Sequence, residues 1–161
     1  MRKFGMVTKL FISPQKDKKD KEEGIHPLIT RIDCIENVGI KGDGNAKGGE
    51  RQVTLMDDSV REWVEKQSIK GLCSSKFKAN ITIKDLNALK LTPGALLHIG
   101  DAVLKVTSTN KKCYGEVCKI YREKLICPIP SGCYFAKVVG SGQIKLKDRG
   151  VVSIESDNYK V

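Results

Sequence analysis

Four cysteines lie close together in the second half of the chain, at Cys113, Cys118, Cys127 and Cys133. The segment around them is basic, because residues 111–149 contain nine Lys or Arg against three Asp or Glu. Positive surroundings favour the thiolate over the thiol, and the thiolate is the form that attacks sulfur and binds soft metals. This segment is therefore the first candidate for a reactive or metal-binding site.

Cys118 is the strongest candidate within this segment. Lys112, Lys119 and Arg122 are close to it in sequence, and their charges would favour its ionised form. Cys34, in contrast, lies in an apolar, strand-like stretch, and we expect it to be buried in the core.

Zinc binding and hydrolase chemistry are disfavoured. Zinc ribbons use paired Cys-x2-Cys knuckles, and no such pair occurs in this chain. The two histidines, His26 and His98, are far apart, and neither lies near a marked serine. No Ser-His-Asp set can therefore be assembled from the sequence.

A second candidate is the glycine-rich stretch at residues 38–50, with five glycines in 13 residues. It matches neither GxGxxG nor the GK[ST] ending of a phosphate loop. Its glycines would still allow close approach of a ligand, with Asp43 and Arg51 as polar groups at the rim. The alternative is a tight connection that needs glycine because φ is positive.

Length and charge narrow the class of protein. We expect residues 1–161 to form one domain, with residues 15–24 as a charged mobile loop. We recognise no secretory signal and no apolar stretch of membrane-spanning length, so the expectation is a cytoplasmic protein without membrane association.

The net charge of +10 predicts anionic partners. Nucleic acid is disfavoured because few aromatic rings lie between the basic residues for base stacking.

Extended segments dominate the predicted secondary structure. Two strands joined at Gly100 and Asp101 are expected within residues 95–109, and Gly140-Ser141-Gly142 predicts a hairpin. The other expected strands are 3–13, 26–36, 51–56, 78–83, 134–139, 143–148 and 151–156.

One helix is predicted in the middle of the chain. Ser59 and Glu62 match a capping box, and Val60, Trp63 and Val64 form an apolar stripe. Because strands and helices do not alternate regularly, a doubly wound fold is excluded. We expect a mostly β protein, either a barrel or a curled sheet.

Eight further pieces of the chain form a recognisable series: LFISP (10–14), GIKGDGNA (39–46), RQVTLM (51–56), KFKANITI (76–83), LTPGALLHIGDAVLKVT (91–107), KKCYGEVCKIY (111–121), CPIP (127–130) and YFAKVVGSGQIKLKD (134–148). In this order they resemble a stand-alone bacterial MOSC domain, the module named for the C-terminus of molybdenum cofactor sulfurase. The resemblance implies a mostly β, barrel-like fold with one main helix and short helical turns.

The resemblance also implies a function. Family members bind the molybdenum cofactor (molybdopterin), or carry sulfur for it, through a reactive cysteine. In relatives that ligate molybdenum, this cysteine falls at the position of Cys118, in a strand-like segment. Cys118 is thus implied as metal ligand or sulfur carrier, with Cys113 and Cys127 as resolving or supporting thiols.

Candidate contacts to the cofactor come from two segments. Arg51 and Lys119 would bind its anionic groups, facing one pocket if the barrel brings their segments together. Asp43 and Asn45 are further candidates from the glycine-rich stretch. Relatives usually carry histidines where this chain has Asn45 and Tyr114.

Several functions stay open at this point. The leading one is a carrier of cofactor or sulfur, acting with cofactor-biosynthesis or molybdoenzyme partners. The second is a molybdenum-dependent reductase of N-hydroxylated compounds that works with an electron-transfer partner. A basic nucleic-acid-binding barrel is the third. Whether the chain is an enzyme, as a sulfur transferase or a reductase, is not decided by its sequence.

Overall fold

The computed structural model describes residues 3–13, 29–68, 78–109, 112–113 and 115–153. The expected mobile loop at 15–24 and Tyr114 lie outside these residues. The expectation of a mostly β fold with one main helix and short helical turns is confirmed. None of the helices among the described residues has the length and apolar character needed to cross a bilayer.

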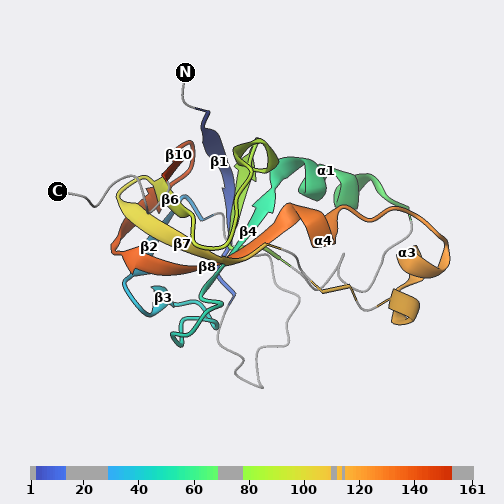
Figure 1. Ribbon diagram of the computed structural model, residues 1–161, viewed down its shortest axis with the longest axis horizontal. Helices are drawn as coiled ribbons and strands as arrows, with labels where there is room; N and C mark the ends of the chain where they lie inside the picture. The colour runs from blue at the N-terminus through green and yellow to red at the C-terminus, as the bar shows by residue number, and fades with distance from the viewer. Residues whose placement is uncertain (1–2, 14–28, 69–77, 110–111, 114, 154–161) are drawn as a thin grey trace.

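Seven strands close into a barrel, in the order β1-β10-β6-β7-β8-β4-β5, and β5 pairs with β1 to complete it (Figure 1). They are β1 (Gly5–Leu10), β4 (Val53–Asp57), β5 (Ile81–Lys84), β6 (Leu96–Ile99), β7 (Ala102–Ser108), β8 (Cys133–Gly140) and β10 (Arg149–Ser153). Neighbouring strands are antiparallel, except for the parallel pair β4 and β5. A smaller sheet in the order β3-β2-β9 contains β2 (Arg31–Ile35), β3 (Gly39–Ile40) and β9 (Gly142–Lys145).

The main helix, α1 (Asp58–Lys66), follows β4 without a loop. Its N-cap is Asp57 rather than a residue of the predicted capping box at Ser59, because the last residue of the strand already provides the capping carboxylate. The carboxylate of Asp57 accepts hydrogen bonds from the backbone and hydroxyl of Ser59 and from the backbone N–H of Asn87. Val60 lies on the buried face of α1, as its place in the apolar stripe predicts.

One of the two expected strand pairs is confirmed and the other is wrong. β6 and β7 form the hairpin expected around Gly100. β8 and β9 do not pair with each other, because β8 pairs with β4 and β7 whereas β9 pairs with β2. Ser141 therefore marks a step from the barrel into the small sheet. A Cβ atom at Gly142 would lie 2.2 Å from the carbonyl oxygen of Asp101, so the close approach at this step requires glycine.

Apolar side chains fill the barrel, in line with the alternation of buried and less buried residues along β1 and β7. Cys34 is buried among them, as predicted. A second, smaller cluster packs where β4, α1 and the start of β8 meet. It consists of Met56, Val60, Ala79, Ile129 and Cys133, with Val64 and Cys127 at its edge.

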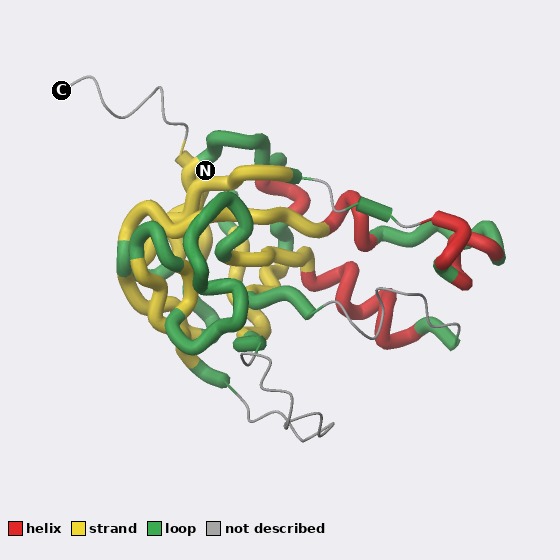
Figure 2. Tube along the Cα trace, turned by 90° about the horizontal axis from the view of Figure 1, so that it is seen from below, coloured by secondary structure: helices red, strands yellow, loops and turns green. Residues whose placement is uncertain are grey.

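Four short helical turns complete the described structure: η1 (Asn87–Leu89), η2 (Gly115–Val117), α3 (Lys119–Arg122) and α4 (Ile129–Gly132). The last three belong to the connection between β7 and β8, which are neighbours in the barrel. Figures 1 and 2 show α3 at one end of the molecule's longest axis, well away from the barrel strands. We call residues 115–126 the α3 lobe.

Candidate functional site

The glycine-rich stretch is fixed by a buried carboxylate, that of Asp43. Asp43 is 1% exposed and accepts hydrogen bonds from the backbone N–H groups of Ser13 (2.8 Å) and Asn45 (3.0 Å). The side chain of Asn80 donates a third, at 3.1 Å. The expectation that Asp43 stands as a polar group at the rim is therefore wrong. Its oxygens fix the loop, because a buried carboxylate must be hydrogen-bonded.

Asn80 extends this support into the barrel. Its side-chain oxygen accepts from the backbone and hydroxyl of Thr54 on β4, and its amide also donates to the backbone oxygen of Phe11. Asn80, Thr54 and Asp43 are all buried. Buried polar groups with satisfied hydrogen bonds specify one arrangement of the segments that they join, here β4, the end of β1 and the glycine-rich stretch.

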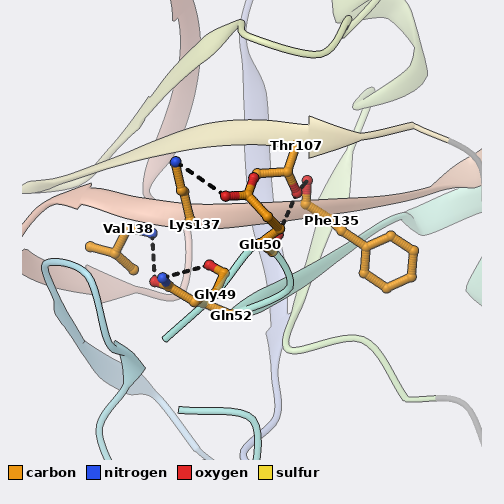
Figure 3. Close-up of polar contacts among 7 residues, drawn as sticks. All are labelled: Gly49, Glu50, Gln52, Thr107, Phe135, Lys137 and Val138. Carbon is orange, nitrogen blue, oxygen red and sulfur yellow. Dashed lines mark hydrogen bonds and ion pairs between the residues drawn. The ribbon is translucent and has the colours of Figure 1, made fainter. Parts of the chain in front are cut away.

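The end of the stretch is tied to the barrel through side chains, as Figure 3 shows. The amide of Gln52 donates to the backbone oxygen of Gly49 and accepts from the backbone N–H of Val138. The hydroxyl of Thr107 donates to the backbone oxygens of Glu50 and Phe135. Positive φ angles at Gly39, Gly42, Gly48 and Gly49 show that the glycines also serve the tight connection that the sequence left as the alternative.

Arg51 and Asn45 are both exposed. The guanidinium of Arg51 lies over the ring of Phe135, with its central carbon 4.6 Å from the ring centroid. Such stacking engages one face of the guanidinium and leaves its edge available to an anion. Both side chains can therefore meet a solvent-borne ligand.

The segment around Cys118 forms two helical turns rather than a strand, which corrects the expectation taken from relatives, and Cys118 itself joins them with extended backbone (φ −98°, ψ 128°). It is the N-cap of α3, directly after η2, and its side chain is half-buried. Its N–H donates to the backbone oxygen of Gly115 at 2.8 Å, and its own carbonyl accepts from the N–H of Arg122 at 3.1 Å. These bonds fix the backbone of Cys118 at the junction of the two helical turns.

Basic side chains follow Cys118 along the α3 lobe. Lys119, Arg122 and Lys124 are all exposed. Beside them is an open hollow of roughly 740 Å³, a volume within the range of ligand pockets. Its lining residues are Glu116, Tyr121, Arg122, Lys124 and Leu125, so Lys119 and Arg51 do not share it.

The cysteines differ in their exposure. Cys113 is exposed, and its sulfur accepts a hydrogen bond from the N–H of Gly115 at 3.5 Å, whereas Cys127 is half-buried at the edge of the second apolar cluster. Cys133 is buried. Burial, followed by the charge of Asp33, raises the pKa of Cys34 to about 12, so this thiol stays protonated at neutral pH.

The structure separates the two groups of candidate residues. β3 and the glycine-rich stretch lie toward one end of the longest axis, and α3 lies at the other end (Figure 1). The sequence could not reveal this separation, because it depends on how far the β7–β8 connection projects from the barrel. It also missed Tyr121, Lys124 and Leu125 as lining residues. The sequence feature that could have identified these lining residues is the mixture of apolar and basic residues after Cys118, which lacks the alternation of a strand.

Comparisons with known proteins agree with the fold. A family model described as the MOSC domain matches residues 42–125. The YuaD protein from Bacillus subtilis is 17% identical, with 94% of this chain and 97% of that chain covered and a TM-score of 0.62. YiiM from Escherichia coli is 14% identical, covers 95% of this chain and 70% of its own, and gives a TM-score of 0.53. No curated protein matches the sequence.

Proposed function

The chain belongs to the MOSC domain family, and on this premise we propose that it binds the molybdenum cofactor and carries cofactor or sulfur through the thiolate of Cys118. The family is typically linked to this cofactor. The observation that supports the choice of cysteine is placement. Cys118 is half-buried within the α3 lobe, between η2 and α3, whereas Cys34 and Cys133 are buried in the body of the protein.

The residues around Cys118 fit such a group. Cys118 offers a soft sulfur atom, and the cations of Lys119 and Arg122 suit phosphate and oxo anions. No three His, Cys, Asp or Glu side chains among the described residues form a group that could hold a metal ion. Within that part of the chain, the protein would thus add one thiolate to a metal that the cofactor's own dithiolene sulfurs already hold. When bound, the cofactor would supply an oxo-molybdenum centre.

Sulfur transfer would use the same thiolate. The ionised sulfur of Cys118 would attack the terminal sulfur of a persulfide on a donor protein, forming a new S–S bond. The donor would leave as a thiolate, and Cys118 would carry the persulfide. We assign Cys113 and Cys127 the role of resolving or supporting thiols, with Cys113 the more accessible of the two.

The test is the composition of the purified protein. Protein expressed in a host that makes the cofactor should contain molybdenum and pterin, and mass spectrometry should detect a persulfide on Cys118 when a donor is present. Cys118→Ala should lose the persulfide and reduce the molybdenum content at least about tenfold, equivalent to about 1.4 kcal/mol of binding. Cys34→Ala, which removes a buried thiol, is the matched control and should retain both.

Charge removal separates the anion contacts. Lys119→Ala should lower the pterin content because it removes a cation next to Cys118. Arg51→Ala removes a cation at the glycine-rich stretch instead. If this variant also has a lower pterin content, the bound group contacts both the α3 lobe and the glycine-rich stretch. Asn45→Ala tests the second exposed side chain of that stretch. Equal pterin content in wild type and Cys118→Ala would refute the assignment of Cys118, and wild type without pterin would refute the proposed function.

The loaded protein also distinguishes a carrier from a reductase. A carrier should pass molybdenum or sulfur to a recipient without turning over an N-hydroxylated compound. Steady reduction of such a compound with an added electron donor would assign the reductase activity instead.

A further inference from the structure

The α3 lobe concentrates the exposed apolar surface of the protein. Among the described residues, the exposed large apolar side chains include Val117, Tyr121, Leu125 and Ile126, which fall within ten residues of one another. Ile126 is 91% exposed and Val117 is 70% exposed. Single exposed apolar side chains are common on surfaces, whereas several within one short segment favour a site of interaction.

Cations surround this apolar surface. Lys119, Arg122 and Lys124 have no ion-pair partner within the described part of the chain, and all three are exposed. Two of them, Arg122 and Lys124, line the hollow of roughly 740 Å³ together with Tyr121, Leu125 and one acid, Glu116. The lobe thus offers a concavity with apolar and basic side chains, and its three cations outnumber its two acids.

The lobe is also accessible and close to the proposed reactive thiol. Figures 1 and 2 show α3 projecting at the end of the longest axis, so that a large partner can approach without meeting the barrel. Cys118 caps the same short helix whose residues line the hollow. A molecule seated on the lobe would therefore be next to Cys118.

We propose that the α3 lobe is the docking surface for a partner protein that presents a large apolar side chain within an acidic segment. The apolar side chain would fill the hollow against Tyr121 and Leu125, and the acids would meet the cations of its rim. This inference rests on the proposed function, because the partner would be the protein that gives or receives sulfur or cofactor at Cys118.

Other occupants fit the observations less well. A second copy of this chain would bring together two proteins that each carry a net charge of +10, and like charges oppose association. A nucleic acid would find one aromatic ring, Tyr121, in the lobe for stacking. A lipid surface would satisfy the charges but has no side chain with which to fill a hollow.

The test uses short fluorescein-labelled peptides and the full-length protein. One peptide contains Phe and Leu among Glu and Asp, a second replaces the acids with Gln and Asn, and a third replaces Phe and Leu with Ala. Fluorescence anisotropy should show that the wild-type protein binds the first peptide at least about tenfold more tightly than the other two. Added salt should weaken this binding because the rim is exposed.

Variants locate the contact. Ile126→Ser and Leu125→Ser should each weaken binding of the first peptide by about fivefold or more, since each removes apolar contact area. Ile35→Ser is the matched control, because Ile35 is 39% exposed on β2, in the small sheet. It should leave the affinity unchanged.

Several results would overturn the inference. One is equal affinity of wild type and Ile126→Ser for the first peptide, or no binding of that peptide at all. Others are Ile126-dependent binding that appears only with phosphatidylglycerol vesicles or single-stranded DNA, or an Ile126-dependent dimer in sedimentation. The outcome is separable from the proposed function, because Ile126→Ser should keep its molybdenum and pterin content, whereas Cys118→Ala should lose that content and still bind the peptide.

Discussion

The barrel and the α3 lobe differ in the exposure of their apolar side chains. In the barrel, Leu97, Ile99 and Leu104 are fully buried, and the few buried polar groups are nearly all hydrogen-bonded. In the lobe, Ile120 is buried but the apolar side chains on either side of it face solvent. The comparison indicates that the barrel residues are explained by folding alone, whereas the lobe residues need a further explanation, which a binding role provides.

The largest expected effect comes from truncating equivalent side chains in the two regions. Leu104→Ala should lower the free energy of unfolding by about 2–5 kcal/mol, because it leaves a cavity in the barrel. Ile126→Ala should change it by less than about 0.5 kcal/mol, because the side chain is exposed. Urea denaturation of the two variants measures both values. A loss of stability in Ile126→Ala comparable to that in Leu104→Ala would mean that the lobe is part of the folding core.

The second largest loss of stability is expected from the buried polar network around Asn80. Asn80→Ala removes hydrogen bonds to Thr54, Phe11 and Asp43, and it leaves the buried backbone N–H of Thr54 without its acceptor. We expect it to destabilise the protein by about 1–3 kcal/mol. Asn45→Ala is the control, since the side chain of Asn45 is exposed, and its effect on the denaturation midpoint should be negligible. Similar midpoints for the two variants would show that the network does not hold the glycine-rich stretch.

The smallest expected effect is the change in the free energy of unfolding with pH that Cys34 causes. The folded-state pKa of Cys34 is raised to about 12 from its ordinary value of 9.0, so the unfolded chain loses this proton first as pH rises. The stability associated with the protonated thiol is complete below pH 9 and declines between pH 9 and 12, by about 1.4 kcal/mol at pH 10.

The comparison with Cys34→Ala isolates this contribution. Between pH 8 and 10 the variant should lose less stability than wild type, whatever its starting stability. Parallel pH profiles for wild type and Cys34→Ala would contradict the predicted shift.

The sequence predicted local features better than long-range ones. The mostly β class, the buried position of Cys34 and the hairpin at Gly100 follow from periodicity and turn residues, which act over a few neighbours. The predicted pairing of β8 with β9 was wrong. Gly140-Ser141-Gly142 resembles a hairpin turn, but β8 pairs with β4 and β7, and β9 pairs with β2. Barrel closure decides such pairings, and no short window contains it.

The candidate site shows the same limit. The basic surroundings of Cys118 were visible in the sequence, but the helical backbone of its segment and its distance from the glycine-rich stretch were not. The interior role of Asp43 was also hidden. A glycine-rich loop with an acid suggests a binding rim, and only the position of Asn80 beneath it shows that the acid faces inward.

The connection between β7 and β8 leaves the barrel and returns to an adjacent strand. In most hairpins a few residues suffice for such a return, so the excursion through η2, α3 and α4 is not needed to close the sheet. Different lineages could therefore lengthen, trim or exchange this excursion while inheriting the same scaffold. Under the proposed docking role, the recognition specificity can then evolve at one insertion point, and chimeras that swap residues 115–126 between relatives should fold while exchanging their partners.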